Sequence, residues 1–98
     1  MIREDILTKL RAFQPQLRRF GVVRLRLFGS FARGSAGPLS DVDLLADFES
    51  GRTPDFVGLM QLEDALAEHL GRRVEITTPR GLHPLIAEEV LAQAIDAA

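Results

Sequence analysis

A pair of aspartates gives this chain its clearest potential for chemistry. Asp41 and Asp43 are two positions apart in an apolar stretch that predicts a strand, so both side chains point to the same face. Two carboxylates held that close repel each other unless a cation lies between them. Mg²⁺ suits such a pair, because it takes oxygen ligands from one or two carboxylates together with substrate phosphates. A solvated strand edge is the ordinary alternative for an isolated Asp-x-Asp.

A glycine-serine turn precedes the aspartates. Gly29 and Ser30 end an alternating stretch that predicts a strand, and the chain then turns into a short helical segment with free backbone amides. Those amides and the Ser30 hydroxyl can hold a phosphate, and Gly29 allows the backbone to approach it closely. A Gly-Ser turn alone is weak evidence. Its conjunction with Asp41 and Asp43, at the same end of one sheet, favours a nucleotide site.

The two parts together resemble a family signature. Gly29-Ser30, ten further residues and then Asp41-x-Asp43 resembles the signature of the DNA polymerase beta-like nucleotidyltransferase superfamily. The strings Leu-Phe-Gly-Ser-Phe-Ala-Arg-Gly and Ser-Asp-Val-Asp-Leu look like its smallest branch, the minimal nucleotidyltransferase (MNT) domains. The resemblance covers essentially the whole chain. It implies that Gly29 and Ser30 hold the triphosphate of a nucleotide, and that Asp41 and Asp43 bind Mg²⁺.

The resemblance also implies two further site residues. Arg33 would lie near the anionic site, although an exposed loop arginine is the equally ordinary interpretation. The family has a third catalytic carboxylate, usually Asp, on the next strand, and the matching residue here is Glu75. Alternation places Glu75 on the face opposite Val74 and Ile76, toward the aspartates if the strands are neighbours. Its alternative is a solvent-facing strand glutamate.

The hydrophobic pattern predicts the elements that must position these residues, in the order α-β-β-α-β-α. Residues 3–13 show helical spacing, which continues to Phe20 with a break near Gln14 caused by Pro15. Further elements are predicted as follows: strands over 22–28, 41–48 and 72–78, mostly turn and loop over 29–40, and helices over 55–70 and 85–95. The expected class is α/β (α+β), a small mixed sheet covered by helices in the nucleotidyltransferase fold.

Composition bounds the remaining possibilities. The 98 residues are 46% hydrophobic and 27% charged, which predicts one domain over residues 1–98. The absence of cysteine excludes disulfides, zinc-thiolate sites and a cysteine nucleophile. No apolar run approaches about 18 residues and the first residues are not those of a signal peptide, so we expect no membrane span and a cytoplasmic location. The net charge of −2 argues against direct nucleic-acid binding.

The resemblance implies a specific activity. MNT domains transfer AMP from ATP to a hydroxyl group, with tyrosine expected, of a partner HEPN-domain ribonuclease toxin, and thereby act as antitoxins. Two alternatives remain: a non-catalytic antitoxin that neutralises the toxin by binding, and a small-molecule nucleotidyltransferase of the aminoglycoside type. A core this short has no lobe to enclose an acceptor, which favours an acceptor brought by another protein.

Overall fold

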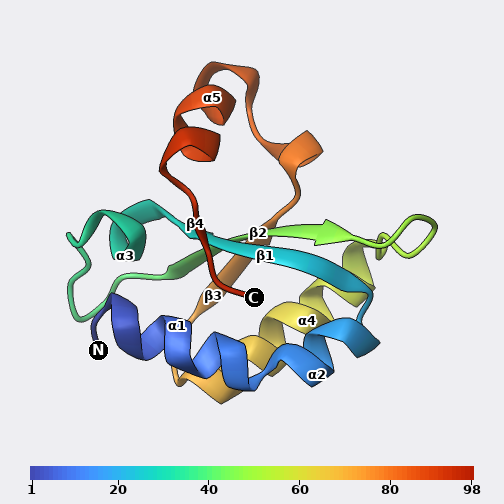
Figure 1. Ribbon diagram of the computed structural model, residues 1–98, viewed down its shortest axis with the longest axis horizontal. Helices are drawn as coiled ribbons and strands as arrows, with labels where there is room; N and C mark the ends of the chain where they lie inside the picture. The colour runs from blue at the N-terminus through green and yellow to red at the C-terminus, as the bar shows by residue number, and fades with distance from the viewer.

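The computed structural model describes residues 1–98 as a four-stranded sheet with helices around it (Figure 1). In chain order the elements are α1 (Arg3–Ala12), α2 (Gln14–Arg19), β1 (Val22–Phe28), α3 (Gly29–Arg33), β2 (Val42–Phe48), α4 (Phe56–Leu70), β3 (Val74–Thr77), the 3-10 turn η1 (Pro79–Gly81), α5 (Pro84–Gln93) and β4 (Ile95–Asp96). Helices α1, α2 and α4 lie on one side of the sheet, and α5 lies on the other. The mixed α/β class is confirmed.

The sheet is mixed, with strand order β3-β2-β1-β4. β1 pairs antiparallel with β2 and with β4, whereas β2 and β3 run parallel. The hairpin-like pair β1–β2 forms the centre, and the crossover through α4 returns the chain to the outer side of β2. This arrangement places the end of β1 and the starts of β2 and β3 at one end of the sheet.

One hydrophobic core fixes which face of each strand is buried. It contains 19 residues, and the β2 residues in it are Val42, Leu44 and Ala46. The alternation of a strand therefore directs Asp43 to the opposite face, away from the three helices. The face of β2 that carries the carboxylates is the face left open by α1, α2 and α4.

The helices end where their sequence requires. α1 and α2 are separated at Phe13, and Pro15 occupies the first turn of α2, where its missing N–H costs nothing. Asp55 caps the start of α4, and its carboxylate accepts a hydrogen bond of 2.8 Å from the Gly58 amide. Gly71 caps the end of α4 and adopts a left-handed conformation with φ 69°.

The C-terminal residues differ from the prediction. The last helix ends at Gln93 rather than Ile95, and the next residues form β4, a strand that the predicted order lacks. The Leu25 amide donates to the Ala98 carbonyl at 2.7 Å, and the Ala97 amide donates to the Leu25 carbonyl at 2.8 Å. These bonds satisfy the outer edge of β1, so pairing with the sheet replaces the last helical turn.

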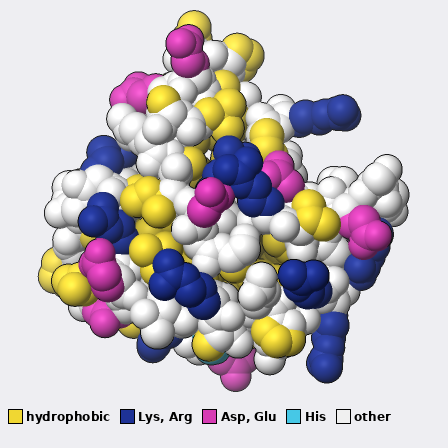
Figure 2. Space-filling view, viewed as in Figure 1, with side chains coloured by type: hydrophobic (Ala, Val, Ile, Leu, Met, Phe, Trp, Pro, Cys, Tyr) yellow, Lys and Arg dark blue, Asp and Glu magenta, His cyan; other side chains and the backbone are white.

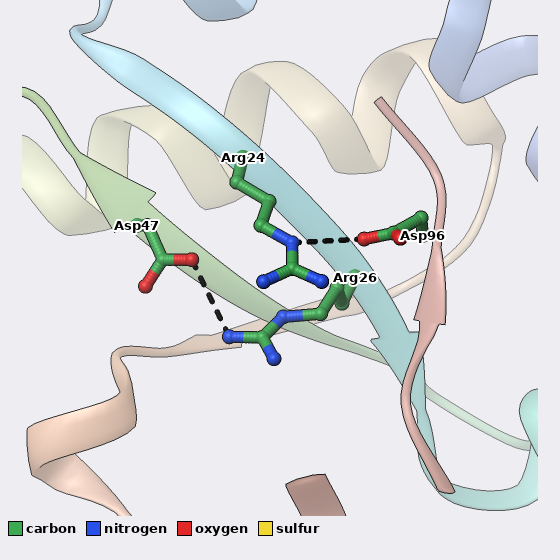
Figure 3. Close-up of polar contacts among 4 residues, drawn as sticks. All are labelled: Arg24, Arg26, Asp47 and Asp96. Carbon is green, nitrogen blue, oxygen red and sulfur yellow. Dashed lines mark hydrogen bonds and ion pairs between the residues drawn. The ribbon is translucent and has the colours of Figure 1, made fainter. Parts of the chain in front are cut away.

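Two ion pairs on this face of the sheet join β1 to its two neighbouring strands, β4 and β2 (Figure 3). Arg24 donates to Asp96 at 2.9 Å, which joins β1 to β4. Arg26 donates to Asp47 at 3.3 Å, which joins β1 to β2, and its side chain is only 11% exposed. Both arginines therefore join strands of the sheet.

The outer strand β3 is protected by a side chain. Its Ile76 amide donates a 2.7 Å hydrogen bond to the carboxylate of Glu63, which projects from α4. The opposite edge of the sheet is covered by β4.

None of the helices has the length and apolarity needed to cross a bilayer.

Candidate functional site

Strand register brings the predicted carboxylates together. Asp43 of β2 is paired directly with Glu75 of β3, and Asp41 lies two residues before Asp43. Paired residues on neighbouring strands have side chains on the same face, within about 5 Å at their Cβ atoms. The predicted orientation of Glu75, opposite Val74 and Ile76 and toward the aspartates, agrees with this register.

The pKa of Asp43 reports its surroundings. Partial burial of Asp43 raises the pKa of its carboxyl group above the ordinary value of 3.8, and the negative charges of Glu75 and Asp41 raise it further. The positive charge of Arg33 acts in the opposite direction. Burial and the two neighbouring carboxylates therefore outweigh the positive charge of Arg33, so ionisation of Asp43 is disfavoured.

Gly29 lies directly against Asp43. Its φ of +74° is one that residues with a side chain rarely adopt, and a Cβ built on it would overlap the Oδ2 atom of Asp43. Gly34 has a nearly identical φ of +76°, but a Cβ there would meet nothing within 4 Å. Gly29 is thus required for two reasons: the conformation of the turn, and the closeness of the turn to the carboxylate.

Ser30 lies in the first turn of α3, which starts immediately after β1. Phe28, which precedes α3, offers no side-chain hydrogen bond to the first amides of the helix. Phe31, which follows Ser30, is only 2% exposed and anchors the turn in the core. The partly exposed Ser30 is therefore held in a fixed turn beside Asp43, whereas the side chain of Arg33 is exposed at the end of α3.

The donor set fits a divalent cation held by two carboxylates. The structure contains no group of three or more His, Cys, Asp or Glu side chains arranged to hold a metal ion. Asp41 and Asp43 can supply carboxylate oxygens from one face, and phosphate oxygens of a substrate would complete the shell, as is usual for Mg²⁺. The raised pKa of Asp43, caused by burial and by the charges of Glu75 and Asp41, supports this fit.

An open cavity lies beside Asp41 and Glu75, on the side of β3, and Asp43 does not line it. It has a volume of about 300 Å³, and its lining includes Asp41, Arg73 and Glu75, together with Glu63 and Asp64 of α4. Because Glu75 is exposed to this cavity, a group approaching from solvent can reach its carboxylate without passing through the core.

Sequence reasoning missed one residue that contacts the site's supporting segments. Arg72 follows the end of α4, and it contacts both Phe31 and the loop before Asp41. No spacing or periodicity marks it, because it lies in a turn and its contacts are 32 or more residues away in the chain. The only local sequence feature beside Arg72 is Gly71, the glycine that caps the end of α4.

Comparison with known proteins finds similar sequences over most of the chain. The family model described as a nucleotidyltransferase domain matches residues 6–96. Protein adenylyltransferase MntA of Thermococcus cleftensis is 40% identical over 93 residues, which cover 94% of this chain and 92% of that protein.

Solved structures share the fold. A structure described as a candidate minimal nucleotidyltransferase has a TM-score of 0.80 and 44% identity, over 97% of this chain and 95% of that chain. A second structure shows a tri-AMPylated HEPN toxin of Shewanella oneidensis in complex with an MNT antitoxin. It has a TM-score of 0.69 over 95% of this chain and 71% of that chain. At 19% identity, that second likeness concerns the fold alone.

Proposed function

The chain belongs to the nucleotidyltransferase domain family and is a nucleotidyltransferase, and from this premise we propose that it uses Mg²⁺ to transfer AMP from ATP to a protein hydroxyl group. The acceptor that we propose is a tyrosine of a HEPN-domain toxin, whose activity the transfer would suppress. The observation that carries the proposal is the arrangement of the Gly29 turn, Asp43 and the register-paired Glu75 at one end of the sheet.

Nucleotide binding would use the turn and the aspartates. The first amides of α3 and the Ser30 hydroxyl would donate hydrogen bonds to the triphosphate, and Arg33 would add positive charge at its edge. Asp41 and Asp43 would hold Mg²⁺, which lowers the negative charge on the phosphates and favours attack on the α-phosphorus. The close contact of Gly29 with Asp43 supports a single site for phosphate and metal.

Transfer would use Glu75. The acceptor oxygen forms a bond to the α-phosphorus, the bond from that phosphorus to the bridging oxygen breaks, and pyrophosphate leaves with the electron pair. Glu75 takes the proton of the acceptor hydroxyl as it attacks. The open cavity beside Glu75 supports approach of the acceptor from that side.

A protein acceptor is supported by the openness of the site and by the relatives. Adenylyltransferase MntA shares 40% identity with the chain, and the similar fold from Shewanella oneidensis occurs in complex with an AMPylated HEPN toxin. The cavity beside Glu75 is open to solvent, so a large acceptor can approach Glu75 from that side.

Intact mass spectrometry tests the proposal. The chain is incubated with ATP, Mg²⁺ and a HEPN-domain protein from a neighbouring gene, and the acceptor is weighed before and after. We expect the added mass of one or more AMP groups, their location on tyrosine by fragmentation, and loss of the transfer with Asp43→Asn. Unmodified acceptor at every Mg²⁺ concentration would refute protein adenylylation.

The substitution of glutamate for the family's usual aspartate favours one second candidate, an antitoxin that acts by binding alone. In that case Asp41→Ala would leave both the complex and the inhibition of the toxin intact. Adenylylation of an aminoglycoside, without modification of the protein, would instead assign the small-molecule class.

Glu75→Gln separates the role of Glu75 from nucleotide binding. We expect transfer to fall by about 10²–10⁴-fold, the usual contribution of a general base, while the Kd for an ATP analogue stays within about twofold of the wild-type value. The matched variant is Glu68→Gln, which changes a glutamate on the exposed part of α4 and should leave the rate unchanged. Equal rates for Glu75→Gln and the wild type would exclude Glu75 as the proton acceptor.

A further inference from the structure

We propose that Arg72 is a positioning residue that joins the two halves of the nucleotide site. The inference rests on the proposed function, because it concerns the geometry needed for nucleotidyl transfer. Arg72 lies outside the signature and touches none of its four residues Gly29, Ser30, Asp41 and Asp43 through a hydrogen bond or ion pair. Its contacts are instead with the segments that carry them.

The first set of contacts is with the loop before β2. The Nη1 atom of Arg72 lies 3.0 Å from the Pro38 carbonyl oxygen, 3.3 Å from that of Ser40 and 3.4 Å from that of Gly37. Ser40 directly precedes Asp41. The two N–H groups of this nitrogen are shared among three carbonyl groups of a loop that has no helix or strand of its own, and the contact with Pro38 is the shortest. Hydrogen bonds from a charged donor are stronger than those from a neutral one.

The second contact is with the turn that carries Ser30. The guanidinium carbon of Arg72 lies 5.2 Å from the centre of the Phe31 ring, within the range of a cation–π interaction. Phe31 directly follows Ser30 and is 2% exposed, so its ring has little freedom to move. The same guanidinium therefore links the Ser30 turn to the loop that ends at Asp41.

The backbone of Arg72 is itself fixed. Its amide donates to the Ala67 carbonyl at 3.3 Å, next to the left-handed Gly71 that ends α4. The following carbonyl, that of Arg73, accepts a 2.9 Å hydrogen bond from the Val42 amide. Arg72 is thus anchored at the junction of α4 and β3, the strand that carries Glu75. The segments that carry Ser30, Asp41 and Glu75 therefore all meet at Arg72.

An arginine is required for both kinds of contact. Its planar guanidinium can stack on a ring through its face while it donates hydrogen bonds through its edge. A lysine keeps the charge but offers a single ammonium group and no flat face. We therefore expect Arg72→Lys to restore only part of the function that Arg72→Gln loses.

Arg52 provides a matched control at the other end of the molecule. Its Nη1 and Nη2 atoms donate to the carbonyls of Arg18 and Arg19, at 3.3 and 2.6 Å. Like Arg72, it is an arginine that holds a loop through backbone carbonyls. The segments that it joins carry none of the proposed site residues. Arg52→Gln should therefore lower stability without altering the chemistry.

The experiment compares Arg72→Gln, Arg72→Lys and Arg52→Gln in the full chain. Melting temperature, Mg²⁺-dependent binding of the ATP analogue AMP-PNP, and kcat and KM for transfer to the partner protein are measured for each. For Arg72→Gln we expect kcat to fall by about 10–100-fold and the AMP-PNP Kd to rise at least severalfold. Arg72→Lys should be intermediate, and Arg52→Gln should keep wild-type binding and kcat after a similar loss of melting temperature.

The outcomes separate this inference from the proposed function. Wild-type kcat and AMP-PNP affinity in Arg72→Gln would overturn the role of Arg72. Equal losses of activity in Arg72→Gln and Arg52→Gln, at equal melting temperature, would show that Arg72 contributes only to general stability. If the wild type binds AMP-PNP but transfers nothing, the proposed function fails, and weaker binding in Arg72→Gln alone still supports the positioning role. A wild type that does not bind AMP-PNP would overturn both.

Discussion

At the scale of single residues, the contact between Gly29 and Asp43 is the tightest constraint in the site. A methyl group at position 29 would meet the Asp43 carboxylate and would also strain a φ of +74°. We expect Gly29→Ala to abolish transfer, because either the turn or Asp43 must move. Initial rates of AMP transfer and melting temperature measure the two effects.

Gly34→Ala is the matched control for this prediction. It carries the same backbone penalty, about 1 kcal/mol for a left-handed conformation, but meets open space. A similar loss of melting temperature with most of the activity retained is expected. If both variants lost activity equally, backbone strain alone would explain the result and the contact with Asp43 would be unimportant.

The ionised carboxylate of Asp43 lowers the stability of the fold, whereas the proposed transfer requires it. Because burial and the neighbouring carboxylates raise the pKa of Asp43, its ionisation costs folding free energy. That cost is absent below pH 3.8 and develops as the pH rises through the folded-state pKa. Without metal at pH 7, Asp43→Asn should therefore raise the melting temperature by about 2–5 °C while abolishing transfer.

Asp47→Asn tests the same change on the same face of β2. Asp47 is paired with Arg26, whose side chain is mostly buried. Removing the Asp47 charge leaves that guanidinium without its partner, so the melting temperature should fall. Scanning calorimetry of the two variants checks the contrast. A lower melting temperature for Asp43→Asn would contradict a net unfavourable ionisation of Asp43.

Sequence could predict which carboxylates share a face of the sheet better than it could predict their environment. The spacing of Asp41 and Asp43 and the alternation around Glu75 predict one shared face, and the register of β2 with β3 agrees. The partial burial of Asp43 and the contacts of Arg72 could not be predicted, since both depend on segments that are distant in sequence and adjacent only after folding.

At the scale of elements, prediction succeeded where a pattern repeats several times. β1 has the bounds of its alternating stretch, and α4 runs from its Asp55 cap to Gly71. β3 is shorter than the predicted 72–78, because Arg72 and Arg73 form the approach to the strand. β4 has two residues, too few for any periodicity, and it exists because the edge of β1 offers hydrogen bonds.

The ion pair between Arg24 and Asp96 should control attachment of β4. The hydrogen bond and charge of Arg24 lower the pKa of Asp96 below its ordinary value. A lowered pKa gives stability that is present above the ordinary pKa and lost as the pH falls through the folded-state pKa. Acid should therefore loosen β4 before the core unfolds.

Hydrogen exchange of the Leu25 amide, which donates to the Ala98 carbonyl, measures this loosening. We expect a lower protection factor in Asp96→Asn at neutral pH, and no further loss in that variant on acidification from pH 5 to about pH 3. Asp64→Asn changes an exposed aspartate of α4 and serves as the control. Identical Leu25 protection in all three proteins would show that the ion pair is irrelevant to β4.

At the scale of the whole molecule, the core and the site lie on opposite faces of the sheet. The 19-residue core faces α1, α2 and α4, so folding does not depend on a ligand at Asp43. On the other side, α5 buries none of its residues, and Leu85 is 87% exposed. Hydrophobic side chains are visible at the surface in the part of the molecule that α5 forms (Figure 2).

This separation predicts how the protein responds to metal removal. A chelator should abolish transfer while leaving the circular dichroism spectrum of a folded protein, because no core residue depends on the metal. Adding Mg²⁺ with AMP-PNP should raise the melting temperature with ligand concentration, as binding to the folded state requires. Unfolding on chelation would contradict the independence of core and site.

The hydrogen bond between Glu63 and the Ile76 amide has a consequence for encounters between molecules. An outer strand with free amides is a template on which a strand from another copy can add. Here a carboxylate occupies the amide of Ile76 and places negative charge along that edge. We therefore expect Glu63 to hinder edge-to-edge aggregation in a crowded solution, a property separate from the fold and the catalysis.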